Sequence, residues 1–280
     1  MSKKLIAISA ILVCLAMTPV KTWGGGGHHL ISRIAYSQLT PAAKVFVLDL
    51  LGDEDFVESS TWADRVRNDR PETYNWHFVN IPYAATSYDP VRDCAPTDRG
   101  DCSIAAIARA RTEIVSMGRS HAQRAESLKF LIHFVEDLHQ PLHNIGNGDR
   151  GGNDVATIVE GLEPAPGRGQ PNLHSVWDSV LISRRGIDEE TYAKELIDRL
   201  KTGSVDDGGD LDDVRWSLEA RDLAVKYVYT YQGFAAGAAP TVAAHIDGTY
   251  ERAAQPIIEK QLMRAGVRLA RILNDASGRR

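Results

Sequence analysis

The segment FLIHFVEDLHQPLHN, residues 130–144, places ionisable side chains inside a strongly apolar stretch. Its pattern predicts a helix that packs on apolar residues. Its ionisable residues are His133, Glu136, Asp137, His139 and His143. A polar group on a buried face costs several kcal/mol unless something satisfies it. The fold of this chain therefore depends on what satisfies these side chains.

Helical periodicity extends over nearly the whole chain. Thr40 and Pro41 suit an N-cap and a first turn, and Gly52 ends the helix that they open. Further helices are expected over residues 103–118, 122–138, 189–200, 218–234 and 239–274. Pro256 is expected to kink or divide the last of these. Because alternating strand patterns are almost absent, the sequence predicts a single all-α domain.

Two stretches interrupt the helical pattern. Residues 80–102 form a predicted loop around two cysteines. Residues 144–173 form a second one, rich in glycine and proline, which is longer than compact domains usually tolerate without a purpose. The second stretch is therefore a candidate for a functional loop.

The first residues are typical of a secretory signal. MSKKLIAISAILVCLAM combines a basic tip with an apolar run of roughly a dozen residues, too short for a membrane span. We expect a signal peptide over residues 1–22, cleavage before Trp23, and a domain over 23–280 in the periplasm or secreted. A lipoprotein anchor at Cys14 is the alternative, but Val13 is bulky where a small residue is expected.

The charge of the mature chain argues against non-specific binding to polyanions. Loss of the three lysines in the signal changes the formal net charge from −5 to −8. Adhesion to nucleic acid or to an anionic membrane through overall charge is therefore not expected. No later segment reaches the length of a membrane span, and none indicates a protein partner.

Cys94 and Cys102 remain after removal of the signal, in the stretch RDCAPTDRGDC. An even pair in an exported chain predicts a disulfide. Two free thiols are the alternative, and a zinc pair lacks nearby partners. The chain has 280 residues, 43% of them hydrophobic, so neither zinc nor a disulfide is needed merely to hold it folded.

Histidine and aspartate recur at a spacing that suits metal binding. His133 and Asp137 lie four residues apart on one predicted helix, and His174 and Asp178 repeat this spacing. Neutral imidazole and carboxylate are suitable zinc ligands. Two such pairs, with His143 beside a proline, indicate a metal site more strongly than one pair would.

Further candidate ligands lie upstream. STWADRVR contains Asp64, with Arg67 three residues later on the same face, and NWHFVNIP contains His77. In WGGGGHH, cleavage would expose the α-amine of Trp23, and four glycines would let it fold back until amine, carbonyl and the His28 imidazole meet one ion.

The remaining ionisable residues are assigned other positions. We expect His139 to lie in the core or behind the ligands, and Glu136, about 100° around the helix from Asp137, to be solvated. His29 is expected to point away from the metal, and His121 and His245 to lie on the surface.

These motifs resemble the zinc-dependent single-strand nucleases of the S1/P1 type. The resemblance rests on WGGGGH, WAD, WHFVNIP, LIHFVEDLHQPLHN, DRGGN and NLHSVWD, which occur in this order over nearly the whole mature chain. It implies a mainly helical fold with three zinc ions at the base of a cleft.

The resemblance also implies a set of ligands. The first zinc would be held by Asp64, His77, His133 and Asp137; the second by His143, His174 and Asp178; the third by the amine and carbonyl of Trp23 with His28, Asp137 bridging the first and third. Arg67 would lie beside the cluster, Phe78 would stack on a base, and Asn80 and Asn153 would contact substrate.

The activity implied is hydrolysis of single-stranded RNA and DNA, and of 3′-nucleotides. Zinc lowers the pKa of bound water towards ~7, which allows in-line attack on phosphorus. Asp64 would help orient the water, and Arg67 would meet the developing charge. Departure of the 3′ oxygen would leave 5′-phosphates. The alternatives are a zinc phospholipase C, whose last ligand pair ends in glutamate, and an exported zinc-binding protein without catalytic activity.

Overall fold

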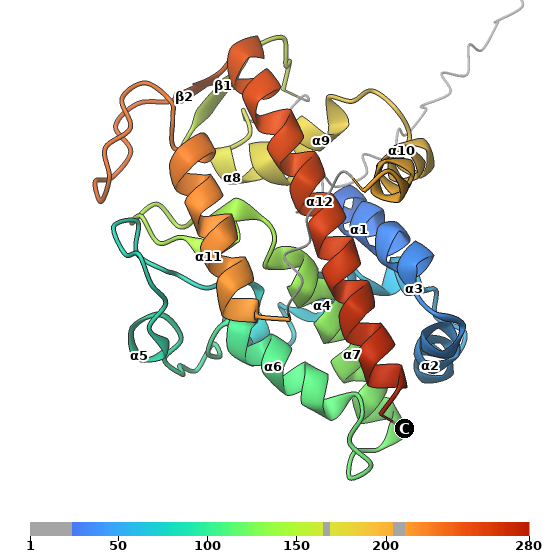
Figure 1. Cartoon of the computed structure of the whole chain (residues 1–280). Coiled ribbons are helices and arrows are strands. Elements are labelled where there is room, and N and C mark those ends of the chain that lie inside the picture. Colours follow the sequence, from blue (N-terminus) through green and yellow to red (C-terminus); the bar gives the residue numbers. More distant parts are fainter. Residues whose placement is uncertain (1–23, 165–168, 204–210, 280) are drawn as a thin grey trace, which may run out of the picture.

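The computed structural model describes residues 24–164, 169–203 and 211–279, and helices dominate it (Figure 1). The predicted signal peptide and Trp23 lie outside these ranges. The α-helices are α1 Gly24–Gln38, α2 Pro41–Leu51, α3 Phe56–Ser59, α4 Trp62–Val66, α5 Pro90–Asp93, α6 Ser103–Glu113, α7 His121–Asp137, α8 Leu173–Ser175, α9 Leu181–Ser183, α10 Glu189–Lys201, α11 Asp213–Leu223 and α12 Gly248–Ser277. The 3-10 helices are η1 Pro71–His77 and η2 Pro141–Asn144, and the π-helices are η3 Val176–Val180 and η4 Ala224–Val228.

The described strands are two short segments, β1 Thr157–Val159 and β2 Ala244–Ile246. They pair in parallel, with Ile158 opposite His245, at the upper left of Figure 1. The sheet joins the long loop after η2 to the segment before α12. The prediction of an all-α fold is confirmed, since this pair is a small addition to a helical body.

The C-terminal helix begins later than the sequence suggested. Residues 239–247 contain β2, and α12 starts at Gly248, where the Asp247 carboxylate accepts hydrogen bonds from two backbone N–H groups. The helix then continues through Pro256 without a break, so the expected division does not occur. Pro256 lies on the exposed face, where water can satisfy the carbonyl that lacks its usual N–H donor.

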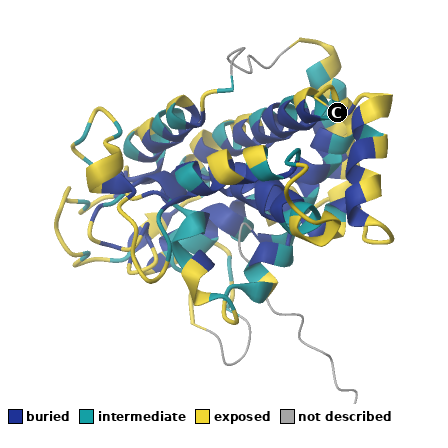
Figure 2. Cartoon of the chain, turned by 90° about the horizontal axis from the view of Figure 1, so that it is seen from below, coloured by how far each residue is buried: buried dark blue, intermediate teal, exposed yellow. Residues whose placement is uncertain are grey.

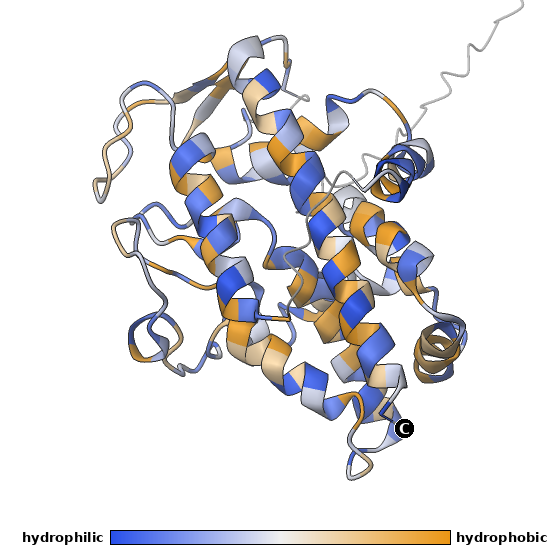
Figure 3. Cartoon of the chain, in the orientation of Figure 1, coloured by the Kyte–Doolittle hydropathy of each residue, from blue (hydrophilic) through white to orange (hydrophobic). Residues whose placement is uncertain are grey.

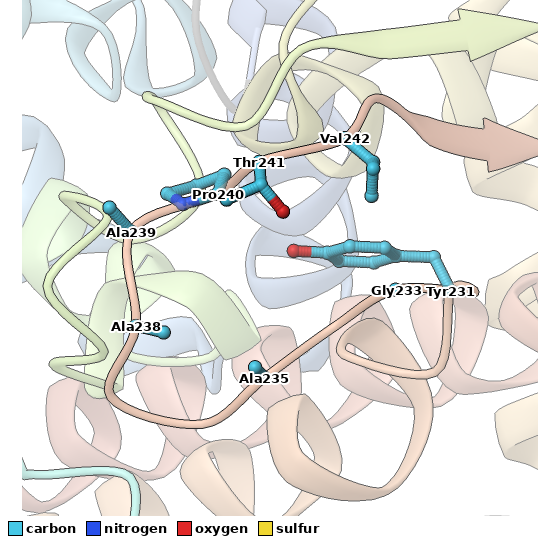
Figure 4. A pocket seen from close by; sticks show the side chains of 8 residues that line it. All are labelled: Tyr231, Gly233, Ala235, Ala238, Ala239, Pro240, Thr241 and Val242. Atoms are coloured by element: carbon cyan, nitrogen blue, oxygen red, sulfur yellow. The ribbon is translucent and has the colours of Figure 1, made fainter.

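The helix expected over residues 218–234 ends earlier than the sequence suggested. Regular α-helix ends at Leu223, and η4 follows, with Tyr229 N–H donating to the carbonyl of Ala224. The chain then leaves the helix and packs Tyr229 against Phe234 at 4.8 Å between ring centroids. Beyond them a loop folds on itself around a pocket of about 80 Å³, lined by Tyr231 and small residues (Figure 4).

The core consists of two buried clusters that α12 links. One lies among α2, α6 and α7 and includes Leu269 and Leu273 of α12. The other lies among α1, α10 and η4 and includes Ile258 and Leu262 of the same helix. Buried residues accordingly occupy the middle of the molecule in Figure 2. The first cluster includes residues of α7, whose C-terminal half is buried on all sides.

The outer helices keep one face in water. In α10 the buried residues are Tyr192, Ala193 and Leu196, and most of this helix is hydrophilic in Figure 3. This pattern is the one expected of a helix that covers a core with a single stripe. No helix in the described ranges is long and apolar enough to cross a membrane.

The predicted disulfide is present between Cys94 and Cys102. It closes the loop between α5 and α6, and both cysteines are buried. The Ser103 N–H donates to the carbonyl of Phe78, so this disulfide loop is attached to the segment that follows η1.

We predict that Gly266→Ala destabilises the protein. Gly266 lies where α12 packs on α1, and an added Cβ would stand 2.4 Å from Cγ2 of Ile34. Overpacking of this kind costs about 1–3 kcal/mol, which outweighs the helix propensity gained. Urea unfolding measures the change in free energy.

Gly248→Ala is the matched control. It lies in the same helix, and its Cβ would meet only the movable end of the Arg252 side chain, at 3.1 Å. We expect it to change the free energy of unfolding little. Equal stability of Gly266→Ala and the wild-type protein would contradict the close packing of α1 on α12.

Candidate active site

The predicted metal ligands converge where α7 meets the shorter helices. His28 comes from α1, Asp64 from α4, His77 from the end of η1, His133 and Asp137 from α7, His143 from η2, His174 from α8 and Asp178 from η3. Their donor atoms form three groups within which all atoms lie within 4.8 Å of one another. The fold therefore brings together every predicted ligand in the described part of the chain, and only Trp23 lies outside it.

The first group consists of Asp64, His77 and His133, and Asp137 adjoins it. His77 Nδ1 lies 3.0 Å from Asp137 Oδ2 and 3.0 Å from His133 Nε2. Asp64 Oδ1 lies 3.7 Å from His77 Nδ1 and 3.8 Å from His133 Nε2. Ligands at zinc's usual bond lengths in a tetrahedron stand about 3.3 Å apart. These separations therefore fit a four-coordinate zinc ion.

The second group joins η2 to α8 and η3. His143 Nε2 and His174 Nε2 face each other at 3.2 Å, and their rings stack. Asp178 Oδ2 lies 3.2 Å from His174 Nε2. Two imidazole nitrogens that both present lone pairs repel, unless a proton or a cation lies between them. This group therefore also fits a metal ion.

The third group brings His28 to Asp137. The Nε2 of His28 lies 3.6 Å from Oδ1 of Asp137, and its ring stacks on that of His133 with centroids 4.1 Å apart. Asp137 Oδ1 faces His28, while its other oxygen, Oδ2, faces His77 and His133 at 3.0 and 3.1 Å. His133 thus belongs to both the first and the third group, and Asp137 directs one oxygen at the donors of each.

The four glycines before His28 form the first turn of α1, and none of them has a positive φ. Gly24 is required for close approach, since a Cβ there would stand 2.6 Å from Oγ of Ser179. The helix thereby starts beside η3, which carries Asp178.

Backbone carbonyls orient three of the imidazoles. The Nδ1 of His133 lies 2.6 Å from Ser60 O, that of His174 2.7 Å from Gly151 O, and that of His143 2.9 Å from His77 O. A carbonyl can only accept, so each Nδ1 carries the proton. Each Nε2 lone pair is then directed into the site, as metal binding requires.

The Glu136 carboxylate orients the imidazole of His28 through its Nδ1. The expectation that Glu136 is solvated is therefore wrong. Its carboxylate is fully buried and lies 2.6 Å from His28 Nδ1, while the Ser32 hydroxyl donates to its other oxygen at 2.6 Å. Apolar residues surround α7 here, so no face of this helix reaches water. FLIHFV, apolar on consecutive positions, is the signal that could have revealed this burial.

Gln140 is a second residue that sequence reasoning did not identify. Its side-chain amide donates to Oδ1 of Asp178 at 2.6 Å and so orients that carboxylate. His139 is buried as expected, with Nδ1 donating to the Val135 carbonyl and Nε2 accepting from Arg268. Burial lowers the pKa of His139 to about 3, so it stays neutral.

The charges of the site are unbalanced without a cation. Burial raises the pKa of Asp137, but His133 and His143 outweigh this effect and hold it well below its usual range. Burial also lowers the pKa of His28 to about 3, so its imidazole is neutral. The pKa of Glu136 is raised well above its usual range by burial. An ionised Glu136 therefore requires positive charge on the other side of His28.

Buried donor atoms that lack a hydrogen-bond partner also indicate that the site is suited to a cation. In the described residues, His28 Nε2 and Asp178 Oδ2 are buried without a hydrogen bond. Buried polar atoms without a partner are rare in folded proteins and call for an explanation. Both atoms belong to groups that suit a metal ion, so the donor set fits zinc.

The site opens to solvent beside Asp64 and Arg67. Their side chains are 22% and 34% exposed, whereas Asp137 is 3% exposed. Arg67 Nη1 lies 3.7 Å from Asp64 Oδ1, which leaves its guanidinium at the edge of the first group. A substrate phosphate approaching from this side would meet Arg67 next to the donors.

The predicted substrate residues lie near this opening or on adjoining loops. Phe78 follows His77 directly and is half-buried. Asn80 is exposed beside Gly146. Asn153 is exposed as well, but its amide donates to the Arg150 carbonyl and accepts from Asn172, so it also holds its loop together.

The fold and the donor groups define a mainly helical protein with a buried histidine and aspartate site suited to metal. A model of the S1/P1 nuclease family matches residues 23–277. The chain belongs to this family and is therefore a nuclease, a hydrolase of phosphodiester bonds. Membership favours the nuclease over a phospholipase C or a non-catalytic zinc-binding protein.

Individual relatives are similar over nearly their full length. Endonuclease 2 of Arabidopsis thaliana is 30% identical, with 97% of this chain and 96% of that protein covered. Nuclease S1 of Aspergillus oryzae is 28% identical, with 95% of this chain and 96% of that protein covered. Nuclease P1 of Penicillium citrinum is 27% identical, with 91% of this chain and 98% of that protein covered.

We predict that Glu136→Gln weakens metal binding about 10- to 100-fold, the usual effect of losing a partner behind a ligand. A glutamine side chain cannot accept hydrogen bonds from both His28 and Ser32. Titration against a chelator of known zinc affinity measures the loss. Glu126→Gln, a change at a half-buried residue on the same helix whose partner is Arg70, is the control. Equal zinc affinity in both variants would show that Glu136 does not orient His28.

Proposed function

We propose that this protein is an exported, zinc-dependent endonuclease that hydrolyses single-stranded RNA and DNA and also removes the phosphate of 3′-nucleotides. The observation that carries the proposal is that Asp137 directs one oxygen at His77 and His133 and the other at His28, in a chain of the S1/P1 nuclease family. Export follows from the predicted signal over residues 1–22. The mature protein would be secreted or periplasmic.

Three zinc ions per chain are part of the proposal. Asp64, His77, His133 and Asp137 would hold the first, and His143, His174 and Asp178 the second. The third would be held by His28, Asp137 and the amine and carbonyl of Trp23. The support is geometric for the described donors, whose separations suit zinc. For Trp23 it is the position of His28 five residues later in the sequence.

Zinc supplies a Lewis acid that neutralises phosphoryl charge and lowers the pKa of water to ~7. The chain's own residues then position the reactants. We infer that Arg67 binds a non-bridging oxygen of the scissile phosphate as negative charge develops there. Asp64, the carboxylate of the first group, would accept a hydrogen bond from the attacking water and fix its direction.

The reaction is a hydrolysis at phosphorus. Water forms a new P–O bond, the bond to the 3′ oxygen breaks, and that oxygen takes up a proton. The products would carry 5′-phosphate and 3′-hydroxyl groups. A 3′-nucleotide would by the same step release inorganic phosphate.

Preference for single strands is inferred from Phe78. Stacking of a base on an aromatic ring is worth about 1–3 kcal/mol, and a duplex conceals the base faces that it requires. Phe78 is half-buried and next in sequence to His77. Its ring meets that of Tyr74 edge-on at 6.1 Å between centroids, which limits its freedom to rotate.

We predict that the mature protein cuts end-labelled single strands faster than matched duplexes and leaves 5′-phosphoryl and 3′-hydroxyl ends. The ends follow from departure of the 3′ oxygen, and the strand preference follows from stacking. Mass analysis of the products identifies the termini. Products with 3′-phosphate, or faster cutting of the duplex, would contradict the proposal.

We predict separately that Phe78→Ala lowers kcat/KM for single strands by about 5- to 150-fold, the equivalent of one lost stacking contact. Zinc content should stay unchanged, because Phe78 supplies no donor atom. Steady-state kinetics and elemental analysis of the same preparation test both statements. An unchanged kcat/KM would mean that Phe78 is not the base platform.

A further inference from the structure

Two guanidinium groups lie against one aromatic ring at the opening of the site. The Cζ of Arg99 is 3.9 Å from the ring centroid of Tyr74, and the Cζ of Arg67 is 5.4 Å from the same centroid. Tyr74 belongs to η1 and also meets the ring of Phe78. Arg99 and Tyr74 have no role in the function proposed above, yet they adjoin two residues that do.

Arg99 is held in place by the disulfide loop, residues 94–102. Its carbonyl accepts a hydrogen bond from the Asn75 N–H at 2.9 Å, and the Asn75 side chain donates to the Gly100 carbonyl at 3.2 Å. Gly100 has a φ of 94°, and a Cβ there would stand 2.5 Å from the carbonyl oxygen of Glu72. The loop is therefore seated closely on η1, which fixes the backbone of Arg99 next to Tyr74.

The charge of Arg99 is available to an anion. Its side chain is exposed, and among the described residues it forms no ion pair with a carboxylate. Neighbouring arginines differ in this respect. Arg70 pairs with Glu72 at 2.5 Å, and Arg92 pairs with Asp93 at 2.6 Å. Stacking on Tyr74 orients the guanidinium of Arg99 while its N–H groups stay in contact with water.

We propose that Arg99 binds a second phosphate of the substrate strand, adjacent to the scissile phosphate at Arg67. Successive phosphates of a strand are separated by one nucleotide, and the base between them would lie by Phe78. Tyr74 serves as the common support of both arginines. This subsite rests on the proposed function and adds a preference for strands of more than one phosphate over dinucleoside monophosphates.

The test uses the mature full-length protein and two substrates. One is a dinucleoside monophosphate, which has a single phosphate, and the other is a single strand of about 20 nucleotides. Arg99→Gln should lower kcat/KM for the long strand about 2- to 5-fold more than for the short substrate, the range of one exposed ion contact. The salt dependence should also weaken, with the slope of log kcat/KM against log salt falling by about 0.7.

Two further variants test whether the effect depends on the charge and on the position of Arg99. Arg99→Lys keeps the charge and should keep most of the salt slope. Arg252→Gln removes an exposed arginine at the start of α12, whose guanidinium donates to Thr249 of the same helix, and should leave the slope as it is. Equal losses on both substrates with Arg99→Gln, or the same slope change with Arg252→Gln, would overturn the subsite.

Failure of the Arg99 subsite can be distinguished from failure of the proposed nuclease function. If the wild-type protein cuts single strands but Arg99→Gln leaves the substrate ratio and the salt slope unchanged, only the Arg99 subsite is wrong. If the wild-type protein with its zinc cuts neither substrate, the proposed function fails and the subsite falls with it.

Discussion

The buried carboxylate of Asp137 is the interaction on which the rest of the site depends. Its side chain is 3% exposed and stays ionised, with Oδ2 directed at His77 and His133 and Oδ1 at His28. A buried anion needs compensating positive charge, and helix α7 can bring Asp137 into the core only if that charge is supplied. Without metal, protonation of His133, whose pKa rises to about 9 because Asp137 and Asp64 outweigh its burial, supplies one positive charge. A zinc ion bound at His133 Nε2 would replace that proton and would supply a larger positive charge to the same carboxylates.

The contacts behind the donors explain why so much of the surrounding fold is polar yet buried. Carbonyls of Ser60 and Gly151, the Glu136 carboxylate and the Gln140 amide each fix one donor. These partners come from loops and helices that lie far apart in the sequence. The two core clusters, linked by α12, hold those segments in register. The opening beside Arg67, with η1 and the disulfide loop at its edge, then determines which substrate can approach.

Much of this architecture could be predicted from the sequence because its signals are local. The i,i+4 pairs His133–Asp137 and His174–Asp178 and the disulfide of Cys94 with Cys102 each depend on short spacing. The contacts of Glu136, Gln140 and Arg99 could not, since they arise between segments that only the tertiary fold brings together. Glu136 shows the difference most clearly: helical geometry placed it away from Asp137, but burial on every side of α7 turned that outer face into a contact with His28. Pro256 does not break α12, because it lies on the exposed face, where water can satisfy the carbonyl that lacks its N–H donor.

We propose that three zinc ions share one cluster that includes the amino terminus of the mature chain. The most direct test is elemental analysis of protein equilibrated with buffered free zinc, comparing chains that begin at Trp23 with chains that carry one extra residue before it. An extra residue converts the amine into an amide, which cannot serve as the same ligand. We expect three zinc ions per chain in the first case and fewer in the second. One zinc or none in the folded Trp23 form, or equal zinc content in both, would contradict a shared cluster of three ions.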